Sequence, residues 1–96
     1  MYYVYFIASF SRTIYIGVTN NISRRTKEHK SNYNPKSFSS RYHCYNLVYY
    51  ECFDSTLDAI DREKQCKRWR RNKKVRLIEE VNPGWQDLST SVEVTD

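Results

Sequence analysis

Five side chains whose chemistry suits phosphodiester hydrolysis lie at four places along this sequence. Tyr5 and Tyr15 stand in two short runs rich in aromatic and β-branched residues, Arg25 and His29 follow four positions apart, and Glu63 comes much later. Such hydrolysis needs a cation for the charge on the phosphate, a group that takes a proton from water, and a carboxylate for Mg²⁺. Each residue alone also fits ordinary packing or a surface position, so their arrangement in the fold decides the matter.

Two strands would position the tyrosines. The runs YYVYFIA at residues 2–8 and TIYIGV at 13–18 predict strands joined by a short polar turn. Because side chains alternate along a strand, Tyr5 falls on the less aliphatic face of the first strand, and Tyr15 and Gly17 fall on that of the second. Glycine in a strand often marks a place where a ligand or another part of the chain approaches closely.

A helix that follows these strands would carry the next two side chains. The segment Thr19-Asn20-Asn21 predicts a helix cap, and the helix should extend to about Lys30. Its only aliphatic residue is Ile22, and helical spacing from Ile22 reaches Arg25 and His29. The face that should dock on the sheet therefore holds charged and polar groups. Such breaks of local rules tend to occur at functional sites.

The rest of the chain predicts an α/β fold with a small three-stranded antiparallel sheet flanked by helices. LVYYECF at 47–53 predicts the third strand, and residues 56–71 and about 73–80 predict two helices. On the longer helix, Glu63 projects beside the apolar stripe. It is either paired with a basic neighbour or directed inward for chemistry, and helix statistics alone favour the ion pair.

Charge is distributed unevenly and favours a polyanionic partner. The net charge is +5, and residues 62–76 hold nine Lys or Arg but one acid. We expect nucleic acid, although a solvated basic helix is the alternative. The polar segment 31–46 interleaves aromatic rings with cations such as Arg41. This pattern suits stacking on the bases of a single strand, or equally covers the edge of the domain.

Composition indicates one domain over residues 1–88 with a disordered acidic tail at 89–96. The three cysteines show no CxxC spacing, so neither a disulfide framework nor a zinc ribbon is predicted. No apolar run is long enough to span a membrane, and the first residues lack the pattern of a signal peptide. We therefore expect a cytoplasmic protein with no membrane partner.

Several motifs together resemble the GIY-YIG endonuclease family. YVY at 3–5, YIG at 15–17 and RRTKEH at 24–29 occur in the family's order. AIDREKQCKRWRR at 59–71 and NPGWQDL at 82–88 are similar to its small stand-alone bacterial members. One departure is that Tyr3 stands where the first motif has glycine.

The resemblance implies a role for each candidate residue. Tyr5 would be the general base or position the attacking water, and nearby cations would have to lower its pKa. Tyr15 would share that proton network or hold the scissile phosphate. Arg25 would stabilise the charge of the transition state, and His29 would orient the nucleophile or a phosphate oxygen. Glu63 would be the single carboxylate that binds Mg²⁺ or Mn²⁺.

Other positions acquire weaker assignments by the same resemblance. Asn82 would contact the catalytic network, although it could equally be a helix-stop residue before Pro83. Basic side chains would contact the nucleic-acid backbone, with Arg24 directed away from Arg25 and the long helix following the phosphates. These nucleic-acid-binding residues are Arg24, Lys27, Arg41, Lys67, Arg68, Arg70 and Arg71.

The sequence thus predicts a metal-dependent DNA endonuclease, with single strands favoured modestly over duplex. Two alternatives stay open. The chain could be a catalytically silent nucleic-acid-binding module, or a nuclease domain that needs a partner for specificity. Monomer and weak dimer are both compatible with the sequence.

Overall fold

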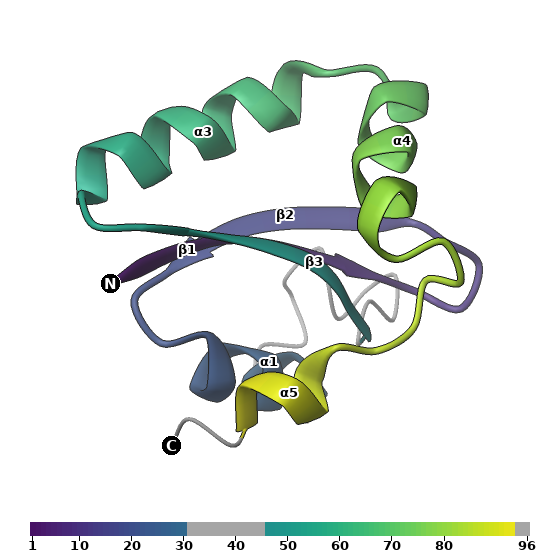
Figure 1. Ribbon diagram of the computed structural model, residues 1–96, viewed down its shortest axis with the longest axis horizontal. Coiled ribbons are helices and arrows are strands. Elements are labelled where there is room, and N and C mark those ends of the chain that lie inside the picture. Colours follow the sequence, from purple (N-terminus) through teal and green to yellow (C-terminus); the bar gives the residue numbers. More distant parts are fainter. Residues whose placement is uncertain (31–45, 94–96) are drawn as a thin grey trace.

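The computed structural model describes residues 1–30 and 46–93, which form a central sheet and four helices (Figure 1). The elements in chain order are β1 (Tyr2–Ala8), β2 (Ile14–Thr19), α1 (Ile22–Lys30), β3 (Asn46–Phe53), α3 (Thr56–Arg68), α4 (Arg71–Val81) and α5 (Ser89–Glu93). The segment 31–45, with Arg41 and most of the predicted aromatic loop, lies outside the described residues.

The three strands form one antiparallel sheet in the order β2-β1-β3. This confirms the predicted fold class. β1 is the central strand, and its Tyr5 lies opposite Gly17 of β2 and Tyr50 of β3. β2 is therefore an edge strand, and side chains that extend from β1 across β2 reach the margin of the sheet.

The sheet lies between two layers of helices (Figure 1). Its aliphatic face, which includes Val4, Phe6 and Ile16, packs against buried residues of α3 and α4 such as Ala59 and Ile78. The opposite face holds a smaller cluster of four buried residues, Tyr5, Ile7, Ile22 and Leu47. The strand alternation read from the sequence is thus confirmed, and the larger core lies on the α3 and α4 side.

An ion pair fixes α3 to the sheet next to Glu63. Arg62 donates from Nε and Nη2 to the two carboxylate oxygens of Glu51 on β3, at 2.8 and 3.0 Å. Both side chains are mostly shielded from solvent, and the bidentate geometry is the strong form of this interaction. It fixes the rotation of α3, and therefore the direction in which Glu63 projects.

The boundary between the two later helices differs from the prediction. The long helix was expected to reach Arg71, but α3 ends at Arg68 and α4 already begins at Arg71. Trp69 adopts an extended backbone there, with Lys73 Nζ 4.4 Å from the centroid of its ring and Arg62 Cζ 5.0 Å away. The break allows α4 to pack Ile78 onto the core. Tertiary packing therefore sets a boundary that local helix propensity does not.

The segment after Leu88 also differs from the prediction. Residues 89–93 form the short helix α5, where a disordered tail was expected, and residues 94–96 lie outside the described residues. Asp87 accounts for the order: its Oδ1 accepts from the backbone N–H groups of Ser89 and Leu47, and its Oδ2 accepts from Lys30. One carboxylate thus joins the end of α1, the start of β3 and α5.

Cys52 and Cys66 are free thiols, and Cys44 lies outside the described residues. In the described ranges, no helix has the length and apolar character needed to cross a membrane.

Candidate active site

The phenol of Tyr5 lies across Gly17 on the neighbouring strand. A methyl group at Gly17 would lie within 2.6 Å of the Tyr5 Cζ atom, which no real side chain tolerates. The tyrosine is only 1% exposed. Glycine in the YIG motif therefore leaves the space through which Tyr5, from the central strand, reaches the margin of the sheet.

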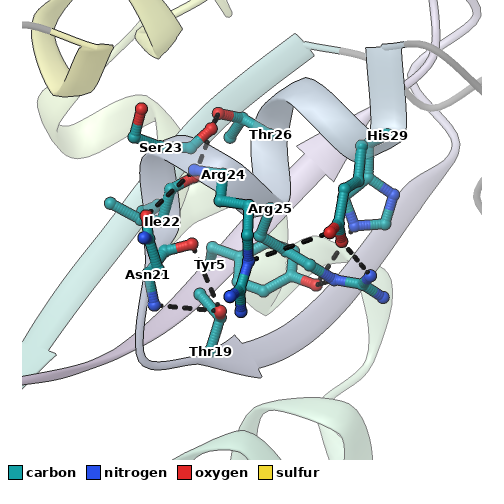
Figure 2. Close-up of polar contacts among 10 residues, drawn as sticks. Tyr5, Thr19, Asn21, Ile22, Ser23, Arg24, Arg25, Thr26 and His29 are labelled. Atoms are coloured by element: carbon teal, nitrogen blue, oxygen red, sulfur yellow. Dashed lines mark hydrogen bonds and ion pairs between the residues drawn. The ribbon is translucent and has the colours of Figure 1, made fainter. Parts of the chain in front are cut away.

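Helix α1 begins where the sequence predicted. Asn21 Oδ1 accepts from the Arg24 N–H at 3.0 Å, and Thr19 Oγ1 accepts from the Asn21 N–H at 3.1 Å. Thr26 is fully buried, and its hydroxyl has a hydrogen-bond partner there because it donates to Ile22 O of the same helix at 3.0 Å. A helix with one aliphatic residue can thus dock closely on the sheet, and this docking brings Arg25 and His29 over Tyr5 (Figure 2).

Arg25, Tyr5 and His29 form a continuous chain of hydrogen bonds. Arg25 Nε donates to Tyr5 Oη at 3.1 Å, and Tyr5 Oη lies 3.1 Å from His29 Nε2 (Figure 2). Arg25 Nη1 donates to Glu28 Oε1 at 2.9 Å. The guanidinium is therefore held on two of its nitrogens, one by the phenol and one by a carboxylate of its own helix.

Burial keeps two members of this hydrogen-bonded network, Tyr5 and His29, in their neutral forms. It raises the pKa of Tyr5 to about 12, because the desolvation of a phenolate outweighs the favourable effect of Arg25. Burial and the Arg25 charge lower the pKa of His29 to about 4. Burial disfavours the charge of Arg25, but the hydrogen bonds that Arg25 donates to Tyr5 and Glu28 outweigh this effect and raise its pKa. Arg25 thus lowers the pKa of Tyr5, as the resemblance requires of a nearby cation, but burial outweighs this effect.

At neutral pH the three groups are thus a guanidinium, a phenol and a neutral imidazole. Arg25 Nε can only donate, so Tyr5 Oη accepts there. Neutral His29 can accept at Nε2, and this tautomer places the phenol proton between Tyr5 and His29. The arrangement is suited to passing a proton from a group bound at Tyr5 to His29.

Tyr15 and Glu63 complete the cluster from two other elements. The Tyr15 ring centroid lies 6.4 Å from that of Tyr5 and 5.6 Å from that of His29. The Glu63 side chain is 16% exposed and its Oε2 lies 3.4 Å from Lys67 Nζ. Its charge contributes to the raised pKa of Tyr5, so the carboxylate lies near enough to act on Tyr5 electrostatically. Glu63 is therefore paired with a basic neighbour and is mostly shielded from solvent.

Two clefts continue from this cluster along β2. The α1–α3 cleft, of about 430 Å³, is lined by residues that include Val18, Arg24, Arg25, Glu28, Thr56 and Ile60. The lysine cleft, of about 270 Å³, is lined by Ile14, Tyr15, Ile16, Lys67 and Lys74. The start of α3 therefore lies by the end of β2, and the end of α3 by its start. The polar cluster lies between the two clefts.

Comparison with known proteins agrees with this geometry. The GIY-YIG catalytic domain family matches residues 1–76, which is most of the chain and includes all five clustered residues. The chain belongs to the GIY-YIG family. This is an endonuclease family, and the matched segment contains Tyr5, Tyr15, Arg25, His29 and Glu63.

Relatives of this GIY-YIG chain are small proteins of similar length. A UPF0213 protein of Haloquadratum walsbyi is 35% identical over 79 residues, covering 82% of this chain and 88% of its own. One from Clostridium perfringens is 36% identical, covering 81% and 83%. The solution structure of the UPF0213 protein BH0048 from Bacillus halodurans superposes with a TM-score of 0.57 at 26% identity, covering 91% of this chain and 93% of the other.

Asn82 has a different environment from the other candidate residues of this GIY-YIG domain. Its Nδ2 donates to Val48 O and to Gln86 O, both at 2.9 Å, and its Oδ1 accepts from the Gln86 N–H at 3.0 Å. Both amide hydrogens of Asn82 are thus donated to backbone carbonyl oxygens. We propose that Asn82 joins the end of α4 to β3, in place of the predicted contact with the catalytic network.

The carboxylates near the site fit a weakly held Mg²⁺ ion. Within the described residues, no three His, Cys, Asp or Glu side chains lie close enough to hold a metal on their own. Magnesium is commonly bound by one or two carboxylates with waters and substrate phosphates, and Glu63 offers one such ligand. Lys67 would have to release Glu63 as the ion binds.

The predicted nucleic-acid-binding residues are solvent-exposed where the structure describes them. Arg24 lines the α1–α3 cleft and Lys67 lines the lysine cleft. Lys27, Arg68, Arg70 and Arg71 are also exposed, and the last three surround the junction of α3 and α4.

Sequence reasoning missed two charged residues at the site. Glu28 holds Arg25, and the spacing of three residues between them in RRTKEH is the signal that could have shown it. Lys74 joins Lys67 only because the chain turns at Trp69, so no local pattern indicates it.

Proposed function

We propose that this chain is a divalent-metal-dependent DNA endonuclease that cleaves single strands in preference to duplex. The hydrogen-bonded chain from Arg25 through Tyr5 to His29 carries the proposal, because it combines a fixed cation with a route for a proton. The three groups are buried or half-buried, and electrostatic effects are strong where water is excluded.

Arg25 would stabilise the charge on the scissile phosphate. Its Nε and Nη1 are held by Tyr5 and Glu28, and within the described residues Nη2 is left for a phosphate oxygen. A guanidinium that is already oriented does not need to reorganise as the charge develops. Glu28 therefore acts on Arg25 as a positioning residue.

Tyr5 and His29 would remove the proton from the attacking water. The water gives its proton to Tyr5 Oη while the phenol proton passes to His29 Nε2, so Tyr5 stays neutral throughout. This route suits a phenol with a pKa of about 12, which is not ionised at neutral pH. The negative charge of a bound phosphate beside Arg25 would favour the imidazolium that forms.

Glu63 would hold Mg²⁺ or Mn²⁺ together with waters and a phosphate oxygen. When bound, the ion would stabilise charge on the attacking and leaving oxygens. Tyr15 lies between Tyr5 and the lysine cleft and would hold the strand by its phenol. Lys67 and Lys74 would contact the neighbouring phosphates of that strand.

The proposal is tested by incubating end-labelled single-stranded and duplex DNA of one sequence with the protein in Mg²⁺, Mn²⁺ or EDTA. We expect cleavage with either ion, faster on the single strand, and none in EDTA. Glu63→Gln should abolish cleavage, whereas Asp61→Asn, on the exposed side of the same helix, should not. Cleavage that continues in EDTA or in Glu63→Gln would contradict the metal assignment, and salt-sensitive binding without cleavage would favour a binding module.

A further inference from the structure

The α1–α3 cleft opens directly beside the proposed catalytic cation. Arg25 lines this cleft and also donates to Tyr5, so a group in the cleft lies next to the phosphate that Arg25 would hold. The volume of about 430 Å³ lies within the range of roughly 300 to 1,000 Å³ found for small-molecule sites. The cleft is thus large enough for one nucleotide of a strand, and it is continuous with the proposed catalytic cluster.

The cleft is lined by both apolar and hydrogen-bonding side chains, a combination that suits a flat, polar ring. Tyr2, Val18 and Ile60 supply an aromatic ring and aliphatic surface. Arg24 and Glu28 supply a donor and an acceptor, and their facing atoms lie 3.8 Å apart. A nucleobase has apolar faces and an edge of hydrogen-bond donors and acceptors, so its two kinds of surface match this lining.

The charges distinguish this cleft from the one at the other end of β2. The lysine cleft has two cations and no carboxylate among its lining residues, and it suits a phosphate. The α1–α3 cleft is also lined by two cations, Arg24 and Arg25, but Glu28 pairs with both and offsets part of their charge, and its carboxylate can accept from the amino or imino groups of a base. The α1–α3 cleft therefore favours a base, whereas the lysine cleft favours a phosphate.

We propose that the α1–α3 cleft binds an unstacked nucleobase of the strand, adjacent to the scissile phosphate. This inference rests on the proposed function and names the feature of the substrate that the site recognises. A base in a duplex is paired and stacked and cannot enter such a cleft without being extruded. The cleft would therefore cause the preference for single strands.

A pair of neighbouring substitutions tests the proposal. Thr56 and Leu57 are both exposed in the first turn of α3, but only Thr56 lines the cleft, and Leu57 is 72% exposed. Thr56→Trp should fill the cleft, and Leu57→Trp adds the same ring outside it. In EDTA, where no cleavage occurs, we expect Thr56→Trp to weaken binding of a short single strand about tenfold, the size of one stacking contact. Leu57→Trp should bind as the wild type does, and duplex binding should change in neither.

An unchanged affinity of Thr56→Trp for the single strand, or an equal loss in Leu57→Trp, would overturn the proposal. A second measurement separates it from the proposed function. Deoxycytidine 5′-monophosphate added to wild type should shift the NMR amide signals of Thr19 and Ile60, whereas deoxyribose 5-phosphate, which lacks the base, should not. Shifts without DNA cleavage would support the base site and refute the nuclease. Cleavage without these shifts, and with normal single-strand binding by Thr56→Trp, would support the nuclease and refute the base site.

Discussion

At the residue scale, hydrogen bonds join the charged guanidinium of Arg25 to Tyr5 and His29, two groups that desolvation keeps neutral. Tyr5 is kept neutral by desolvation although a guanidinium donates to it. His29 is kept neutral by the same desolvation and by the charge of Arg25. A phenol that receives one proton while it releases another avoids the cost of a buried phenolate. The raised pKa of Tyr5 is therefore compatible with a role in proton transfer.

The lowered pKa of His29 predicts how stability depends on pH. The unfolded chain takes up a proton near pH 6.5, but the folded chain resists it until about pH 4, so the free energy of unfolding falls as the pH drops through this window. The loss should reach about 2 to 3 kcal/mol by order of magnitude. His29→Gln should lack this part of the loss, as measured by urea unfolding at pH 7 and pH 4.5.

Other acid-sensitive groups do not disturb that comparison. Glu51 and Asp87 have lowered pKa values, so they also lose stabilising interactions in acid, but both variants contain them and their effect cancels in the difference. A stability difference between wild type and His29→Gln that stays constant from pH 7 to pH 4.5 would contradict the buried, neutral imidazole.

At the scale of elements, the pairing of β1 and β2 determines whether Tyr5 reaches Arg25. Tyr5 lies opposite Gly17, and only the missing side chain at that position lets the phenol pass over β2. The N-terminal cap at Asn21 then sets where α1 begins, and so which of its residues face the phenol. The site depends on these two local features more than on the size of the core.

Gly17→Ala should therefore displace Tyr5. We expect a loss of about 1 to 3 kcal/mol in the free energy of unfolding, as for overpacked cores. We also expect about a 100-fold slower cleavage, because the phenol moves from Arg25. Gly84→Ala is the matched control, since a methyl group there meets nothing closer than 3.6 Å. Urea unfolding and single-turnover cleavage measure both effects, and equal behaviour of the two variants would contradict the role of Gly17.

Sequence patterns predicted some features of these elements correctly but not others. Alternation in β1 and β2 and the cap of α1 are local signals, and the structure confirms what they predicted. The raised pKa of Tyr5 could not be predicted from the sequence, because its burial depends on a helix that docks from elsewhere in the chain. The break at Trp69 and the order of 89–93 depend on packing and on Asp87, which no local pattern indicates.

At the scale of the whole molecule, the helices place cations on both sides of the proposed catalytic cluster. The helices α1 and α3 lie on opposite sides of the sheet (Figure 1), and residues of both line the α1–α3 cleft beside the end of β2. The end of α3 and the start of α4 extend the positive charge beyond the lysine cleft, through Arg70 and Arg71. We propose that a nucleic-acid strand follows these cations past the site of Tyr5.

Removal of Arg70 and Arg71 should weaken DNA binding without regard to sequence. For a single strand, the slope of log K against log salt should fall by about 0.7 for each phosphate that the protein no longer neutralises. Arg76→Ala is a suitable control, because Arg76 lines the same surface hollow as the acidic Glu79 and Glu80. Fluorescence anisotropy over a range of salt concentrations measures the slope, and an unchanged slope in Arg70→Ala/Arg71→Ala would place the strand elsewhere.

The most direct test of the account removes a single oxygen atom. Tyr5→Phe deletes the Oη that joins Arg25 to His29, and Tyr50→Phe deletes the same atom from the residue that lies opposite Tyr5 on β3. In single-turnover cleavage of a single strand with Mg²⁺, we expect Tyr5→Phe to be slower by about 100-fold or more, and Tyr50→Phe to remain near wild type. Wild-type cleavage by folded Tyr5→Phe would contradict the account, because the proton would then leave the water by another route.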